Sequence, residues 1–205
     1  MINVRELEIT IGARVLMSGV NFQVSKGDKV GLVGRNGAGK TTLTKVIAGD
    51  FQPSNGSVER IGEIGYLPQD PRTGDLEELA SDRILNSRGL GTILKKLEAT
   101  REQMGSVDEA VYEQAMERYE KLENQFQANG GYAAEAEAAA IASNLGLKPN
   151  VLSQPIGTLS GGQRRRIELA RILFSDATTM ILDEPTNHLD ADSIIWLREF
   201  LKNYQ

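Results

Sequence analysis

The chain has 205 residues, of which 40% are hydrophobic and 25% charged, and its formal net charge is −5. It holds no cysteine and one histidine, which excludes disulfides, thiolate metal sites and a multi-histidine zinc centre. The acidic balance gives no global basic field for nucleic acid, so only a local basic patch would serve that purpose. No apolar run approaches the roughly 18 residues of a membrane span, and the start is too charged for a signal peptide. We therefore expect a cytoplasmic protein without a membrane span of its own.

The first part of the chain is predicted to form β-strands. Apolar residues largely alternate with polar ones over residues 2–11 and cleanly over 20–24, as in strands with one buried face. A turn is predicted at 25–28. The short apolar run at 29–33 (KVGLV) is typical of a buried parallel strand.

The next segments alternate between helix and strand. A helix is predicted over residues 41–48, ending at Gly49. The turn-forming sequence at 52–56 (QPSNG) precedes short strands predicted near 57–60 and 63–67.

The chain is predicted to be helical from about residue 75 to residue 147. Two apolar stripes with helical spacing stand on either side of a predicted turn at 105–108, where Asp108 would cap the second helix. The stripes are Ile93, Leu94 and Leu97, then Val111, Ala115, Tyr119, Leu122 and Phe126. This pattern favours a helical hairpin. A buried strand over 178–182 and a helix over 192–204 are predicted to follow.

Residues 34–41 (GRNGAGKT) fit the phosphate-loop pattern G-x-x-x-x-G-K-[ST] directly after a predicted strand and before a helix. Glycines allow successive backbone N–H groups to face phosphate oxygens, and the helix N-terminus adds partial positive charge. Lys40 would contact the β- and γ-phosphates, and the Thr41 hydroxyl would bind Mg²⁺. The alternative is a glycine-rich turn with an exposed lysine. The predicted ATP-binding set here is Gly34, Arg35, Asn36, Gly37, Ala38, Gly39, Lys40, Thr41 and Thr42.

Two acidic residues, Asp183 and Glu184, follow the predicted strand near 178–182. Ligands of open α/β sheets bind where strands end. Asp183 would hold Mg²⁺, usually through water, and Glu184 would polarise the attacking water. The alternative is a solvated strand end. Together with the phosphate loop, the catalytic interpretation is favoured.

Four further motifs carry a family resemblance. The sequence LSGGQ at residues 159–163 resembles the signature motif of ATP-binding cassette (ABC) ATPases. Gln69 matches the Q-loop glutamine, Asp183 and Glu184 lie in the matching DEPT sequence, and Asp190 matches the D-loop aspartate. Motif order and spacing extend the resemblance over essentially the whole chain.

The resemblance implies a fold and a site. The fold class is α/β, a P-loop ABC ATPase cassette with an antiparallel β subdomain and a helical subdomain carrying a helical-hairpin insertion. The expected divisions are 1–74, the β-rich and P-loop part; 75–147, the helical subdomain; and 148–205, with the signature helix and the two acids.

Two cassettes would face each other head to tail around two ATP molecules, the second being in the same full-length chain or in a homodimer. By resemblance, Ser160, Gly161, Gly162, Gln163 and Asp190 contact ATP. Gln69 joins Lys40 and Glu184 as a catalytic residue, and joins Thr41 and Asp183 at the metal. ATP and Mg²⁺ are the expected cofactors.

Some positions depart from the family pattern. No aromatic residue occurs at 11–15, where the family stacks one on adenine, so Val15 or Ile11 is expected to make an apolar contact instead. His188, the only histidine, precedes Asp190 and belongs to the D-loop turn rather than to the switch position. The arginines at 164–166 could be a solvated helix face and receive no catalytic role. Since the chain stops in a helix that should lead to another strand, we expect it to be the first of two cassettes.

The long helical region between Gln69 and Ser160 points to one branch of the family. With the sequences at 130–132 (GGY) and 187–190 (NHLD), it resembles ABC-F proteins, which are duplicated ATPases without membrane spans. That resemblance implies binding to the ribosome near the tRNA exit site, as a translation factor or in protection from antibiotics. Basic residues of this region could reach rRNA or tRNA phosphates or could be ordinary helix-surface charges. They are Arg83, Arg88, Lys95, Lys96 and Arg101.

Two other functions compete with this interpretation. The chain could be the ATPase subunit of a membrane transporter, which a co-purifying permease would favour. It could also be a nucleotide-binding module without hydrolysis, which the presence of Glu184 disfavours.

Overall fold

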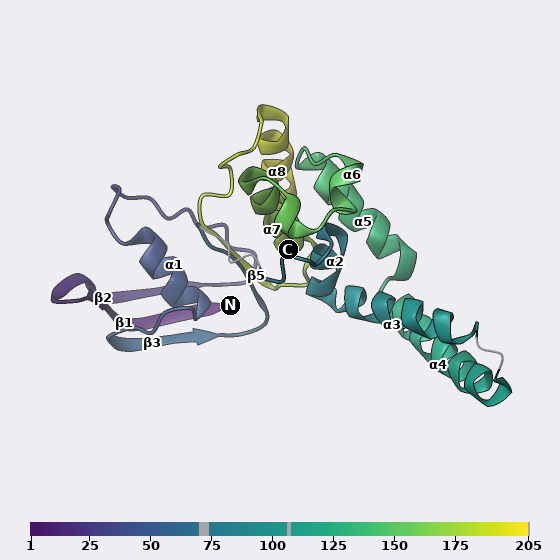
Figure 1. Cartoon of the computed structure of the whole chain (residues 1–205). Helices are drawn as coiled ribbons and strands as arrows, with labels where there is room; N and C mark the ends of the chain where they lie inside the picture. Colours follow the sequence, from purple (N-terminus) through teal and green to yellow (C-terminus); the bar gives the residue numbers. More distant parts are fainter. Residues whose placement is uncertain (70–73, 106–107, 205) are drawn as a thin grey trace. The chain divides into compact units, whose positions relative to one another are not determined.

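The structure is a computed structural model that describes residues 1–69, 74–105 and 108–204 (Figure 1). The chain divides into two compact units. The β-rich unit comprises Met1–Pro71, Asp176–Asn187 and Ile194–Gln205. The helical unit comprises Arg72–Ser175 and His188–Ser193. Residues 148–175 lie in the helical unit, whereas the sequence interpretation grouped them with 176–205.

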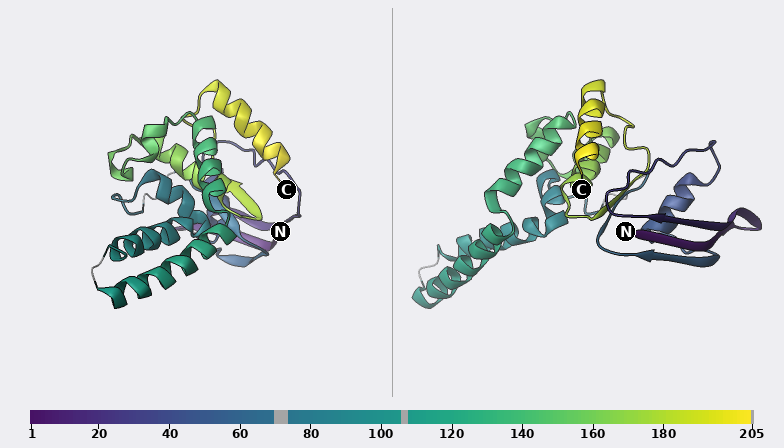
Figure 2. Two further views of the ribbon diagram at one scale, coloured as in Figure 1. Left: turned by 90° about the vertical axis from the view of Figure 1, so that its right-hand side faces the viewer. Right: turned by 180° about the vertical axis from the view of Figure 1, so that it is seen from behind.

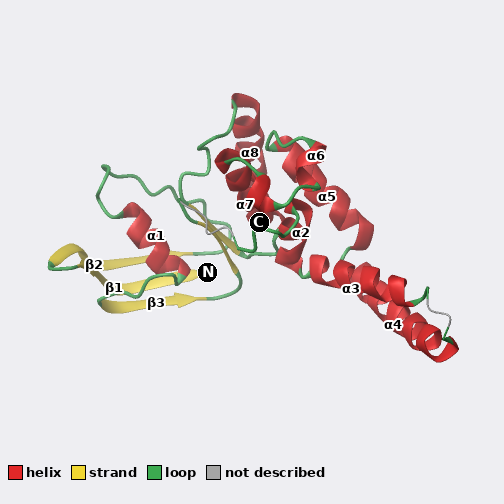
Figure 3. Ribbon diagram, viewed as in Figure 1, coloured by secondary structure: helices red, strands yellow, loops and turns green. Residues whose placement is uncertain are grey.

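An antiparallel sheet in the order β2–β1–β3 forms one part of the β-rich unit (Figure 3). The strands are β1 (Ile2–Ile11), β2 (Arg14–Val24) and β3 (Asn55–Arg60). The helix α1 (Lys40–Ala48) packs on it and buries Leu43, Val46 and Ile47 against the apolar face of β1. The strands and helix predicted for these segments are confirmed.

A bulge explains why the alternation in β1 is imperfect. The pairing register shifts between Val4 and Leu7, and Glu6 between them has φ +46°. The extra residue changes the phase, so that Val4 and Leu7 are both buried despite their odd spacing. The bulge lies against Gly56 of β3, where a side chain would clash: a Cβ there would lie 2.3 Å from the Glu6 carbonyl oxygen.

A second, parallel sheet pairs β4 (Ile64–Leu67) with β5 (Thr179–Leu182). The predicted strand at 29–33 is wrong: this run is not a strand, and Val30, Leu32 and Val33 are 68%, 47% and 92% exposed. An apolar run becomes a strand only where a neighbouring strand accepts its hydrogen bonds. The described ladders of β4 and β5 join these two strands only to each other.

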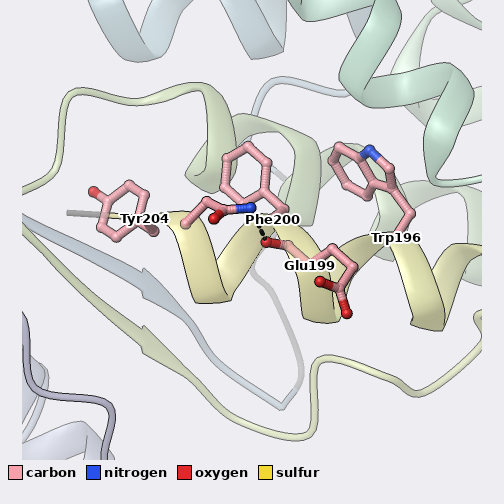
Figure 4. A pocket seen from close by; sticks show the side chains of 5 residues that line it. Trp196, Glu199, Phe200 and Tyr204 are labelled. Carbon is pink, nitrogen blue, oxygen red and sulfur yellow. Dashed lines mark hydrogen bonds between the residues drawn. The ribbon is translucent and has the colours of Figure 1, made fainter.

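The helix α8 (Ala191–Asn203) follows the second sheet. Trp196, Phe200 and Tyr204 form an aromatic row along it, with ring centroids 5.3 and 6.3 Å apart. These rings line an open pocket together with Glu199 and Asn203 (Figure 4).

The helical unit consists of helices from two stretches of chain, and all its described regular elements are helical. Their bounds are α2 (Ala80–Leu85), η1 (Asn86–Arg88), α3 (Leu90–Gln103), α4 (Glu109–Ala128), α5 (Gly131–Asn144), α6 (Pro149–Leu152), η2 (Ile156–Thr158) and α7 (Gly161–Phe174). The predicted helical region is therefore confirmed.

The helices α3 and α4 lie side by side as a hairpin (Figure 2). Asp108 caps α4 as predicted, since its carboxylate accepts hydrogen bonds from the backbone N–H groups of Ala110 and Val111. Of the predicted turn, residues 106–107 lie outside the described part of the chain.

The predicted apolar stripes are buried to different degrees. Ile93, Leu97, Ala115 and Phe126 are buried, and the Phe126 ring meets Tyr132 edge to face at 5.3 Å. Leu94, Tyr119 and Leu122 are half-buried, and Val111 is exposed. The hairpin therefore packs most closely away from Val111, at its base.

Candidate functional site

The glycine-rich loop precedes α1 in the β-rich unit. Gly37 and Gly39 have φ of +79° and +92°, a region that glycine enters without strain. Lys40 bends back over the loop, where its ammonium donates to the carbonyl oxygens of Gly34 and Arg35 at 2.8 and 3.0 Å. The loop therefore has a fixed cation above it and a helix N-terminus behind it, as phosphate binding requires.

Side chains of β2 lie against this loop. The position of a Cβ at Gly39 would be 3.2 Å from the Met17 side chain and 3.5 Å from that of Leu16. Val15, the next residue along β2, is 54% exposed, and Ile11 is 51% exposed. Both residues predicted to contact adenine are therefore accessible apolar groups, and Val15 directly precedes the two residues that lie against the loop.

Arg60 of β3 holds the opposite end of α1. Its guanidinium donates to the carbonyl oxygens of Ile47 and Val46, both at 2.6 Å. A cation at a helix C-terminus pairs with carbonyls that have no intrahelical partner. Sequence reasoning missed this residue because its partners lie 13 and 14 positions away on another element.

The two acidic residues follow β5. The backbone N–H of Asp183 donates to the Leu67 carbonyl at 3.0 Å, which continues the ladder with β4. Asp183 is 8% exposed, whereas Glu184 is exposed. Asn187 donates to the Glu184 carboxylate at 2.7 Å. Gln69, two residues after Leu67, is brought to the same edge of the sheet.

Glu184 has an unusual backbone conformation with φ +48°. Non-glycine residues seldom adopt this region, and such strain gathers at functional sites. The turn that follows is closed by a hydrogen bond of 3.2 Å from the Asn187 backbone N–H to the Glu184 carbonyl. This turn thus fixes the exposed Glu184 carboxylate just beyond the end of β5.

Tyr66 connects the acidic edge with α1. It pairs with Ile181 in the β4–β5 ladder, and Ile181 packs against the core that contains α1. Burial raises the pKa of Tyr66, an interaction with the Thr44 hydroxyl opposes the rise, and the negative charge of Asp183 adds to it. Through its ladder partner Ile181, Tyr66 therefore links the strands that end at the acidic edge to the core that contains α1.

A magnesium ion suits the donors predicted for it. The hydroxyl of Thr41, the amide of Gln69 and the carboxylate of Asp183 are hard oxygen ligands, which Mg²⁺ prefers. Among the described residues no three His, Cys, Asp or Glu side chains cluster as a self-sufficient metal site. A site of this composition needs phosphate oxygens and water to complete six ligands.

The signature sequence begins α7 in the helical unit. The Ser160 hydroxyl oxygen accepts from the Gln163 backbone N–H at 3.3 Å, and the Ser160 N–H donates to the Gln163 side chain at 2.9 Å. This is a capping box, so the motif is a helix cap in structural terms. Ser160 is exposed, and capping uses only its acceptor side, so its hydroxyl proton remains able to donate.

The arginines after the signature sequence are not a solvated face, contrary to that alternative. Arg165 is 6% exposed, and Arg166 donates to the carbonyl oxygens of Gly162, Leu145 and Gly146. Arg164 is half-buried. Arg166 therefore joins α7 to the end of α5.

Asp190 caps α8. Its carboxylate accepts from the Ser193 backbone N–H at 2.9 Å. Hydrogen bonds from Ser193 hold the pKa of Asp190 below its ordinary value, and the positive charge of Arg166 acts in the same direction. His188 has φ +67° in the turn before it, as expected of a residue with a local structural role.

Two of the basic residues proposed to reach RNA are engaged within the helical unit. Arg83 pairs with Glu168 at 2.7 Å, and the Glu168 side chain is 5% exposed. Arg88 pairs with Glu137 at 2.8 Å and stacks over the Phe174 ring at 3.9 Å. These contacts favour a structural role for both arginines over contact with RNA phosphates, the two alternatives that the sequence left open.

The other three basic residues of this set stay exposed. Lys95 pairs with Asp82 at 3.3 Å but keeps 58% of its side chain exposed. Lys96 and Arg101 are exposed on α3.

Comparisons with known proteins show which family the chain is similar to. The family model described as "ABC transporter" matches residues 17–187. Curated relatives include the tylosin resistance ATP-binding protein TlrC of Streptomyces fradiae, 37% identical over 94% of this chain and 36% of its own length. ABC transporter F family member 5 of Arabidopsis thaliana is 31% identical over 91% of this chain and 28% of its own. The energy-dependent translational throttle protein EttA of Mycobacterium tuberculosis is 32% identical over 94% and 34%.

The chain spans about a third of the length of these relatives. Among solved structures, a dimeric ATP-binding cassette in a post-hydrolysis state bound to ADP and phosphate matches with a TM-score of 0.65 and 20% identity. That match covers 98% of this chain and 81% of the other, and it shows the cassette fold. No helix in the described part of the chain is both long and apolar enough to cross a membrane. The chain belongs to the ABC transporter family, as an ATPase cassette of that family.

Proposed function

We propose that the chain is one cassette of an ABC-F type tandem ATPase that acts in the cytoplasm on the ribosome. The observation that carries this proposal is the α3–α4 hairpin inside the helical unit. The relatives' names support it, since they include a translational throttle, an antibiotic-resistance protein and an F family member. The action would be that of a translation factor or of a protein that protects ribosomes from antibiotics.

ATP would lie on the glycine-rich loop of residues 34–42. Its β- and γ-phosphates would take the place of the Gly34 and Arg35 carbonyls as partners of the Lys40 ammonium. Thr41, Gln69 and Asp183 would hold Mg²⁺, which offsets phosphate charge when bound. Val15 or Ile11 would cover one face of adenine.

Hydrolysis needs a base near water. Glu184 suits this role because it is exposed, follows a buried aspartate and is oriented by Asn187. As a general base, it would take a proton from the attacking water as the water oxygen bonds to the γ-phosphorus atom. The bond from that phosphorus to the β,γ-bridging oxygen would break, and ADP would leave.

The second half of the site would come from another cassette. Its loop would bind an ATP whose γ-phosphate accepts hydrogen bonds from the Ser160 hydroxyl and the backbone N–H groups that begin α7. Gly161 suits a close approach, since a Cβ there would meet nothing within 4 Å. ATP would thus favour the closed pair of cassettes, and the ribosome would bind that closed state more tightly.

Ribosome contact through the hairpin is tested by charge reversal. In the full-length tandem protein, the double variant Lys96→Glu with Arg101→Glu should lower the ATP turnover that ribosomes stimulate, because salt-dependent phosphate contacts would be lost. Its turnover without ribosomes should stay unchanged. Arg198→Glu, on α8 and 63% exposed, is the matched control. Equal stimulation in all three proteins would contradict a role for this face. Stimulation by a permease instead would favour a transporter subunit.

A further inference from the structure

Arg166 makes an unusual set of hydrogen bonds in the helical unit. It lies on the second turn of α7, and its Nε donates to the Gly162 carbonyl at 3.3 Å. Its Nη1 donates to the carbonyl oxygens of Leu145 and Gly146 at 3.3 and 3.1 Å. One guanidinium thus ties the first turn of the signature helix to the end of α5.

The segment that contains Asp190 and Ser193 also lies at this point, next to Gly146. It has φ +73° after the last turn of α5, and a Cβ there would lie 3.1 Å from Arg166 Nη1 and 3.0 Å from the Asp190 carboxylate. The same Cβ would be 3.4 Å from the Ser193 hydroxyl. The arginine and the aspartate therefore converge on one glycine, which leaves no room for a side chain.

The charges of this cluster are complementary. The Asp190 carboxylate accepts from the Ser193 N–H at 2.9 Å. Bonds from Ser193 hold its pKa below the ordinary value, and Arg166 lowers it further. Because the guanidinium is planar with several donors, it can bond carbonyls and face a carboxylate at once.

We propose that Arg166 is a positioning residue for ATP hydrolysis, which fixes the backbone of the signature sequence and the D-loop carboxylate in one arrangement. The inference rests on the proposed function, in which both segments contact nucleotide across the cassette pair. Arg166 donates a hydrogen bond to the Gly162 carbonyl, and its positive charge acts on the Asp190 carboxylate. It acts through these two residues, so its loss should misplace the groups that meet the γ-phosphate.

A purely structural role makes a different prediction. If Arg166 only stabilised the fold, Arg166→Ala would lower the melting temperature and leave turnover per folded molecule unchanged. A positioning role lowers kcat with little change in the KM for ATP, because misplacement of about 1 Å costs catalysis more than ground-state binding.

The test uses the full-length tandem protein and four variants of it. We expect Arg166→Ala to lower kcat about tenfold or more, with KM changed by less than about threefold. Arg166→Lys should recover part of the loss, because one ammonium can still reach a carbonyl. Gly146→Ala should lower kcat in the same manner from another element. Arg164→Ala, on the same helix, is the matched control and should keep kcat within about twofold. Soluble yield and melting temperature give the folded fraction.

A double-mutant cycle with Asp190→Asn tests the coupling. If Arg166 acts through Asp190, the double variant should lose much less than the product of the two single losses. Unchanged kcat per folded molecule in Arg166→Ala and Gly146→Ala, or independent losses in the cycle, would overturn the inference. Should Arg166→Ala fail to fold, Arg166→Lys and Gly146→Ala decide in the same way.

The proposed function has its own readout in this experiment. If the wild type turns over no ATP, or Glu184→Gln hydrolyses it as fast as the wild type, the proposed function fails and this inference falls with it. If the wild type hydrolyses ATP, Glu184→Gln does not, and Arg166→Ala behaves like Arg164→Ala, only the positioning role is wrong.

Discussion

The backbone N–H of Asp183 donates a 3.0 Å hydrogen bond to the carbonyl oxygen of Leu67, 116 residues earlier in the chain. This bond extends the parallel ladder of β4 and β5 by one step beyond their last paired residues. Gln69 and Glu184 each lie two residues beyond the end of their strand. Their arrival at one sheet edge is the structural basis for treating them as parts of one ATP site.

Replacement of Glu184 by Gln tests the general base. The amide keeps the shape and can still bond Asn187, but it cannot take a proton from water. When the corresponding base of the second cassette is also changed to Gln, we expect ATP hydrolysis by the full-length tandem protein to fall by about 100-fold or more while ATP binding persists. Single-turnover hydrolysis and binding of a fluorescent ATP analogue measure the two separately. Retained turnover would rule out Glu184 as the base.

Two variants at Ser160 separate its capping role from its proposed contact with phosphate. Ser160→Ala removes the cap of α7 and should cost about 1 kcal/mol in the free energy of unfolding. Ser160→Asp keeps a strong cap, so its stability should stay within about 0.5 kcal/mol of the wild type. It places a negative charge where a γ-phosphate is expected, so ATP-dependent closure should be lost. Chemical denaturation and turnover are measured side by side, and an active Ser160→Asp protein would refute the contact.

The titration of Asp190 provides a pH test. Its hydrogen bonds with Ser193 and the charge of Arg166 predict a midpoint below the ordinary aspartate value of about 3.9. Because the folded pKa is lowered, the carboxylate favours the folded state above its unfolded pKa. That contribution is lost as the pH falls through the folded value. Carbon-13 NMR of the side-chain carboxyl measures the midpoint, and Arg166→Ala should move it upward. A midpoint at or above the ordinary value would contradict the geometry.

The ion cluster around Glu168 predicts a stability effect. Arg83 and Arg171 donate to its two carboxylate oxygens at 2.7 and 2.8 Å, and the acid is 5% exposed. Arg83→Ala leaves a buried carboxylate with one of these partners gone and should cost about 2–4 kcal/mol. Lys202→Ala, which removes the exposed pair with Glu199, should change the free energy of unfolding far less. Urea denaturation measures the free energy of unfolding of both variants. Equal losses would contradict the prediction that the buried pair stabilises the fold more than the exposed one.

Local signals account for what the sequence predicted well. The alternation in β1, the glycine at residue 49 that ends α1 and the cap at Asp108 each depend on residues within a few positions, so the corresponding elements appear close to where they were expected. The helix predicted to start at Thr41 begins one residue earlier, at Lys40 of the phosphate loop.

Long-range partners account for what could not be predicted. Arg83 meets an acid 85 residues away and Arg88 one 49 residues away, so neither pairing leaves a trace in local spacing. Arg166 has partners 20 and 21 residues earlier. The run at 29–33 has the composition of a strand, but hydrogen-bonded neighbours decide that state, and composition does not encode them.

Ribosome co-sedimentation tests the central claim most directly. The full-length tandem protein, with Glu184→Gln in this cassette and the corresponding change in the second cassette, is mixed with purified ribosomes with and without ATP. The account predicts that it pellets with ribosomes only when ATP is present, because the closed pair of cassettes is the binding form. An absence of pelleting with ATP, together with retention of the protein by membranes that carry a permease, would contradict it.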